Sequence, residues 1–169
     1  PQAPLAPVAC TPQAMQLATA GDTIFLDAGI YDSYMAVSAT ETAGVHITKD
    51  SISLIGVDSG VTIIDPPFDS NVGGLYGIYA TTRANLLIKN IGVTGAQTGI
   101  FFYDVERSTL RGDSVTLCGA HGFLLAYNSE TNTVTGCVSS RNLGNGFRMG
   151  EYNNTVTQSM AVSNVTAGI

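Results

Sequence analysis

The sequence contains few sets of side chains that could carry out acid–base chemistry. Four acidic residues recur at related positions in its second half: Asp104, Glu106, Glu130 and Glu151. Hydrolysis of a glycosidic bond with inversion needs two carboxyl groups about 6.5–9.5 Å apart. Carboxylates that recur in this way make these four residues weak catalytic candidates, although a solvated polar edge is the simpler interpretation and the one we favour.

Histidine and cysteine add little to this set. His121 lies in the turn sequence Gly119-Ala120-His121-Gly122 and is a fifth catalytic candidate. It is a weak one, because a histidine in a turn is usually solvated. The three cysteines are Cys10, Cys118 and Cys137, an odd number without the spacing of metal ligands. We therefore expect no metal site, no cofactor and no disulfide between Cys118 and Cys137.

Composition excludes two classes of partner. The chain has 169 residues, of which 44% are hydrophobic and 12% charged, and its net charge is −6. Lysine and arginine do not cluster, so we expect no nucleic acid as partner. No run approaches the roughly 20 apolar residues of a membrane span, so none is expected.

The elements that would position these residues follow from an internal repeat. The repeat is marked by glycines that are each followed by isoleucine or phenylalanine. They stand at positions 77, 99, 122, 146 and 168, so their spacings are 22, 23, 24 and 22. The segments Asn132-Thr133-Val134-Thr135 and Asn154-Thr155-Val156-Thr157 are again 22 apart. This period is too short for a propeller blade of about 40 residues. It fits three short strands and three turns, which predicts an all-β, single-stranded right-handed parallel β-helix with 22–24 residues per rung.

The first part of the chain predicts how this coil begins. Residues 1–10 are rich in proline and alanine and indicate an extended arm. Residues 11–20 predict a short capping helix with Thr11 as N-cap and Gly21 just past its end, with Ala14, Leu17 and Ala18 on its apolar face. The β-helix domain, cap included, then covers residues 11–169, and about 6.5 rungs are expected from its period.

Because successive side chains of a strand point to opposite faces, the residues after each repeat glycine can be assigned to the inside or the outside of the coil. The residues expected inside the coil form two rows, Ile78, Ile100, Phe123, Phe147 and Ile169, and Ala80, Phe102, Leu125 and Met149. The residues between these rows, expected to point outward, are Tyr79, Phe101, Leu124 and Arg148. This outer stripe is either covered by a flanking loop at residues 66–74 or serves as a docking face or a stacking platform for sugar rings.

Two segments also resemble known proteins. Ala20-Gly21-Asp22-Thr23-Ile24-Phe25-Leu26 and the following Asp27-Ala28-Gly29-Ile30-Tyr31 resemble the opening of pectate-lyase-like β-helix proteins. The Asn-Thr-Val-Thr-Gly and Gly-Asn-Gly-Phe phrases are similar to repeats of the NosD-like group and of many microbial surface proteins. The resemblance implies the fold, but this fold hosts lyases, hydrolases, adhesins and passive spacers. The Asp-Asp, Asn-x-Asp and Gly-His-Gly motifs of the polygalacturonase type are missing.

These observations favour a non-enzymatic structural module that is secreted or displayed on a cell surface. The alternative is a fragment that binds or degrades polysaccharide as a lyase or glycoside hydrolase. Residues 161–169 end on an inward-facing position, so we expect this end to self-associate or to meet another domain. Asn153 and Asn164 head two N-glycosylation acceptor sequences that matter if the chain is exported.

Overall fold

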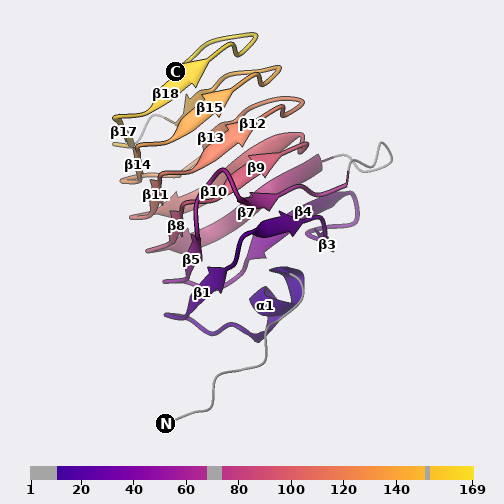
Figure 1. Cartoon of the computed structure of the whole chain (residues 1–169). Helices are drawn as coiled ribbons and strands as arrows, with labels where there is room; N and C mark the ends of the chain where they lie inside the picture. Colours follow the sequence, from indigo (N-terminus) through magenta and orange to yellow (C-terminus); the bar gives the residue numbers. More distant parts are fainter. Residues whose placement is uncertain (1–10, 68–73, 151–152) are drawn as a thin grey trace.

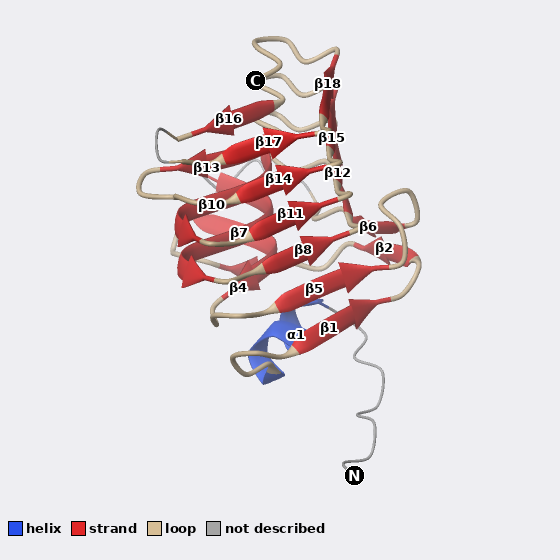
Figure 2. Ribbon diagram, turned by 90° about the vertical axis from the view of Figure 1, so that its left-hand side faces the viewer, coloured by secondary structure: helices blue, strands red, loops and turns tan. Residues whose placement is uncertain are grey.

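Three short strands recur in each turn of the chain, and successive turns stack into a coil (Figure 1). The computed structural model describes residues 11–67, 74–150 and 153–169. In these residues the strands form three sheets of six strands each, which run along the sides of the coil (Figure 2).

Sheet A comprises β1 (Thr23–Leu26), β5 (Ser53–Gly56), β8 (Leu87–Lys89), β11 (Thr109–Arg111), β14 (Thr133–Thr135) and β17 (Thr155–Thr157). Sheet B comprises β2 (Gly29–Tyr31), β6 (Thr62–Ile64), β9 (Gly92–Thr94), β12 (Ser114–Thr116), β15 (Val138–Ser140) and β18 (Met160–Val162). Sheet C comprises β3 (Met35–Ala36), β4 (Glu41–Ile47), β7 (Gly74–Ala84), β10 (Thr98–Glu106), β13 (Phe123–Ala126) and β16 (Phe147–Met149).

Strand pairing confirms the predicted solenoid. Ile100 pairs in parallel with Ile78 on one side and with Phe123 on the other, so the segments around the repeat glycines lie one rung apart. Within the described residues, β3 is the exception, because it pairs antiparallel with β4. Parallel stacking satisfies the backbone groups of each inner strand with its two neighbours.

A short helix covers the N-terminal end of the coil (Figure 1). This helix, α1 (Thr11–Leu17), ends three residues earlier than predicted. It buries Met15 and Ala18, whereas Leu17 is exposed, so the expectation that Leu17 packs on the coil is wrong. The Thr11 hydroxyl donates to the carbonyl oxygen of Gly44 at 2.9 Å, and this bond ties α1 to β4.

The predicted inward rows form the core of the coil. Ile78, Ile100, Phe123 and Phe147 are fully buried, and the rings of Phe123 and Phe147 stack with centroids 4.8 Å apart. In the second row, Met149 is only partly buried. Ile169 is 70% exposed, so in this structure it is not the core residue that the sequence predicts.

The repeat glycines are required by close approach rather than by left-handed backbone. A Cβ on Gly77 would overlap the side chain of Val93, and one on Gly99 would overlap Val115. Neither glycine has a positive φ; the left-handed positions lie elsewhere in the repeat, for example at Gly112 with φ 67°. Sheets B and C therefore meet so closely that only glycine fits along this edge.

Candidate functional site

The four predicted stripe residues lie in one row on the outer face of sheet C. Tyr79 pairs in register with Phe101, Phe101 with Leu124, and Leu124 with Arg148. His46 of β4 precedes them in the row, and its ring centroid lies 5.4 Å from that of Tyr79. Strand alternation points these side chains away from the core, because their neighbours in sequence are buried inside.

The N-terminal end of this row is covered. Tyr79 is only 9% exposed, and the ring of Tyr76 stacks on it with centroids 4.9 Å apart and an interplanar angle of 22°. The Tyr76 hydroxyl donates to Glu41 at 2.7 Å, and burial together with this carboxylate raises the pKa of Tyr76. Residues 68–73 of the predicted covering loop lie outside the described residues. The open part of the stripe therefore begins at Phe101.

A shallow depression follows this point on the outer face of sheet C. Its volume is about 360 Å³. Its lining residues, which we call the sheet C groove, are Phe101, Leu124, Ala126, Tyr127 and Arg148. Three of the five belong to the predicted stripe. The groove thus combines apolar and aromatic surface with one guanidinium group.

Two tyrosines that the sequence analysis did not single out lie together here: Tyr127 lines the groove, and Tyr103 packs against it. Tyr127 follows Ala126, the register partner of Tyr103 in the next rung, and the two tyrosine ring centroids are 4.2 Å apart. Tyr127 is 64% exposed, and its positive φ of 56° ends the strand and turns its side chain outward. Phe101 meets Tyr103 edge to face at 6.3 Å. The signal in the sequence was two aromatic residues separated by one repeat.

His121 lies beside Arg148 at the turn between sheets B and C. The backbone N–H of Asn145 donates to His121 Nδ1 at 3.1 Å, and Arg148 Nη1 lies 3.1 Å from His121 Nε2. Burial and the nearby guanidinium lower the pKa of His121, so the ring is neutral at physiological pH. The Nδ1 lone pair is already used, which leaves the neutral ring no free lone pair to act as a base.

The described acidic candidates, Asp104, Glu106 and Glu130, are not among the residues that line the groove. Glu106 and Glu130 are bridge partners on neighbouring rungs, and Glu106 forms an ion pair with Arg107. Asp104 has a positive φ of 56° where β10 continues past its partner strand. Glu151 lies outside the described residues. None of the described groove residues carries a carboxylate.

The two predicted glycosylation acceptors have different surroundings. Asn153 is exposed. The carboxamide of Asn164 is half-buried: its nitrogen donates to the Ser139 carbonyl at 3.0 Å, and its oxygen accepts from the backbone N–H of Asn142 at 3.0 Å. A glycan on Asn164 would break the bond from its nitrogen, whereas Asn153 projects where a glycan can be attached.

The buried titratable groups are held inside the coil. Cys118 and Cys137 are free and buried, and burial raises the pKa of each thiol to about 12. Burial also raises the pKa of Asp113 to about 7. Its Oδ1 accepts from the backbone N–H of Ile91 at 2.9 Å, whereas Oδ2 has no partner in the described part of the chain. Within that part, no three His, Cys, Asp or Glu residues are grouped as metal ligands.

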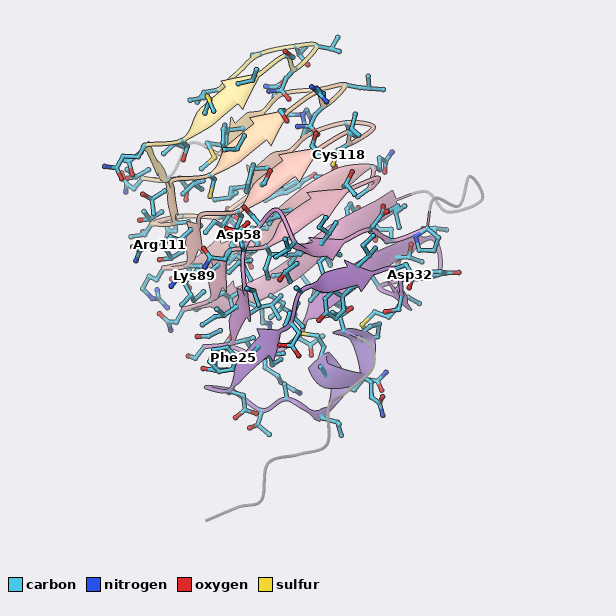
Figure 3. All side chains as sticks on the ribbon, in the orientation of Figure 1. Phe25, Asp32, Asp58, Lys89, Arg111 and Cys118 are labelled. Atoms are coloured by element: carbon cyan, nitrogen blue, oxygen red, sulfur yellow. The ribbon has the colours of Figure 1, made fainter. Side chains whose placement is uncertain are left out.

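The outer faces of the other two sheets differ from that of sheet C. Lys89 and Arg111 are register partners on sheet A and project from the same side of the coil (Figure 3). Sheet B carries a depression of about 200 Å³. The residues that line it are Ser59, Ile63, Gly92, Val93, Thr94, Ser114 and Thr116. The exposed ring of Phe25 lies in the same outer row of sheet A, two register positions before Lys89, but neither Lys89 nor Arg111 lines a depression with it. The depression on sheet B is lined by neither an aromatic ring nor a charged side chain.

The comparisons with known proteins agree with the geometry. The family model described as right handed beta helix region matches residues 18–169. No curated protein and no solved structure matches the chain. In the described residues, no helix has the length and apolar character needed to cross a membrane. The match covers nearly the whole coil, and the chain belongs to the right-handed β-helix family.

Proposed function

We propose that this chain is a non-enzymatic β-helix module, secreted or displayed on a cell surface, that binds carbohydrate in the sheet C groove. The observation that carries the proposal is the exposed ring of Tyr127, which packs against the tilted ring of Tyr103 and lines a depression that also contains Arg148. Sugar rings present apolar C–H faces that pack on aromatic rings, and their hydroxyls bind to polar groups at the rim.

Repetition supports an extended ligand rather than a small one. The groove residues Phe101, Leu124 and Arg148 come from three successive rungs, and neighbouring strands in a sheet are about 4.8 Å apart. A row of this kind presents similar contacts at a regular spacing along the coil. A linear oligosaccharide has a regular spacing of its own and suits such a surface.

The arrangement of the acidic residues supports binding without cleavage. Hydrolysis needs an acid and a second carboxylate on either side of the scissile bond. The described lining of the groove contains Arg148 as its charged residue, and Glu106 pairs with Arg107 outside it. Among the described lining residues, a sugar held in the groove would therefore meet no pair of carboxyl groups of the kind that the hydrolase mechanism needs.

The test is a titration of the purified chain with a panel of neutral linear oligosaccharides, followed by calorimetry. We expect saturable binding that Tyr127→Ala weakens about tenfold, the equivalent of one lost ring-stacking contact. Tyr34→Ala is the matched control, because Tyr34 is 47% exposed but does not line the groove. Equal loss in both variants, or no binding across the panel, would contradict the proposal. Release of new reducing or unsaturated ends would contradict its non-enzymatic part.

Self-association is a second candidate, favoured by apolar side chains on the outer surface of the last rungs. Leu143 is 65% exposed, and Met160 and Val162 of β18 are 54% and 41% exposed. Exposed apolar groups near a sheet edge promote pairing with another copy. Light scattering at micromolar concentration tests this candidate, and a monomeric mass that Met160→Ser leaves unchanged would exclude it.

A further inference from the structure

The protonation of the His121 ring is fixed by the backbone. The N–H of Asn145 points at Nδ1 at 3.1 Å, and an amide N–H can only donate. Nδ1 must therefore be the unprotonated nitrogen of the neutral ring. The single ring proton lies on Nε2, so this atom is a donor as well.

This assignment changes the meaning of the contact with Arg148. A guanidinium group has donors only, and Arg148 Nη1 lies 3.1 Å from Nε2. Two donors at this distance form no hydrogen bond with each other. The contacts of the described residues contain no oxygen acceptor for His121 Nε2 or for the Arg148 guanidinium. Arg148 in the lining of the sheet C groove and His121 beside it thus present adjacent N–H donors that have no oxygen acceptor among the described residues.

We propose that His121 Nε2–H and the Arg148 guanidinium form an oxyanion-binding site at this edge. A single oxygen can lie within hydrogen-bond distance of both nitrogens, or the two oxygens of one carboxylate can each take one donor. Arginine favours such two-point contacts with planar or tetrahedral oxyanions. The ligand class is an anionic oxygen group, a carboxylate or a sulfate ester. The identity of the molecule that carries this group rests on the proposed function: in a carbohydrate ligand, the anionic group is a charged substituent of the sugar.

The surroundings support a site for an anion. Arg148 is the charged group that acts on His121, and it lowers the pKa of the ring. The acidic residues Glu106 and Glu130 lie on the bridge that follows β10, not among the residues lining the groove. Leu124 pairs with Arg148 and lines the groove beside it. An anion here is attracted by one guanidinium and receives a second hydrogen bond from a neutral donor.

The first experiment measures the tautomer directly. Ring ¹⁵N chemical shifts of His121 in the ligand-free protein at pH 7.5 should show a protonated Nε2 and an unprotonated Nδ1. The opposite tautomer would make Nε2 an acceptor for Arg148, leave no N–H on Nε2 for an anion, and overturn the inference. This measurement requires no carbohydrate, so its outcome does not depend on the proposed function.

The second experiment titrates the same protein with sodium sulfate and, separately, with sodium acetate, at constant ionic strength maintained with chloride. We expect saturable shifts at His121, Arg148 and Asn145. Arg148→Gln and His121→Phe should each weaken them at least tenfold. Arg111→Gln is the matched control, since Arg111 is an exposed arginine on sheet A, and should bind as the wild type does. Equal binding by Arg148→Gln and wild type would overturn the site. Stronger binding of acetate or of sulfate identifies the anionic group.

Discussion

Early and late rungs of the coil differ at the three corners where the chain turns inward. The corner residues of the rung that contains β8 and β9 are Leu86, Ile91 and Ala96. In the next rung they are Ser108, Asp113 and Cys118, then Asn132, Cys137 and Asn142, and in the last rung Asn154, Ser159 and Asn164. The same positions therefore change from apolar to polar along the coil.

The difference shows two ways of filling one position. In the late rungs, the corner side chain accepts from the backbone N–H one rung earlier: Asn132 Oδ1 accepts from Ser108 and Asn142 Oδ1 from Cys118, both at 2.9 Å. An apolar corner contributes buried area, which depends on volume. A polar corner contributes a hydrogen bond, which depends on register. The late rungs are thus more specific in alignment and less tolerant of a lost partner.

Serine substitutions at one corner position in three successive rungs, Ile91, Asp113 and Cys137, test this comparison. Ile91→Ser should have the largest effect. Ile91 is fully buried among apolar side chains. We expect a loss of about 3–5 kcal/mol in the free energy of unfolding, from lost burial and the cavity left behind. Chemical denaturation measures it. A loss below about 1 kcal/mol would mean that the early corners tolerate polar residues as well as the late ones.

Asp113→Ser, one rung later, should change the pH dependence of stability. Burial raises the pKa of Asp113 from 3.8 to about 7, so between these values the folded state holds a proton that the unfolded state releases. The free energy of unfolding of the wild type therefore falls as pH rises from about 4 to about 7, by roughly 3–4 kcal/mol. Serine at this position, as at Ser159, accepts the N–H bond without titrating, and the variant should lose this slope.

Urea denaturation at several pH values checks this expectation. The matched control is Asp27→Ser, because Asp27 is an exposed carboxylate and its removal should keep the wild-type slope. An unchanged slope in Asp113→Ser would show that another group is responsible.

The repeat made the fold predictable, because glycine spacing reports directly on the rung length. The paired strands and the rows of Ile100 and Phe123 follow from it. The sequence could not show that Met15 rather than Leu17 packs on the coil, since the short helix has two alternative apolar faces. Nor could it show that Tyr76 covers Tyr79, because this contact depends on the hydrogen bond from Tyr76 to Glu41, 35 residues earlier.

The groove was predictable in part. Alternation placed Phe101, Leu124 and Arg148 in one row, but Tyr127 reaches it only because its backbone is left-handed at the end of β13. The tautomer of His121 was out of reach as well, since it depends on the direction of a single backbone N–H at Asn145. Features set by strand period were thus available from sequence, whereas those set by local backbone direction required coordinates.

Cys137→Ser, in the third rung of the same row, should have the smallest effect. Cys137 already behaves as a polar corner residue: its sulfur lies 3.5 Å from the Thr135 carbonyl, and the backbone of Asp113 in the preceding rung acts to lower the pKa of the thiol, against the larger effect of burial. Ser159, one rung later, makes the equivalent pair of contacts through its hydroxyl, to the Thr157 carbonyl at 2.9 Å and from the backbone N–H of Cys137 at 3.1 Å. Serine can therefore replace the thiol with both contacts kept, and we expect a loss below about 1 kcal/mol by chemical denaturation. A loss as large as that of Ile91→Ser would show that this corner of the third rung depends on apolar volume, as the corner at Ile91 does, and not on its polar contacts.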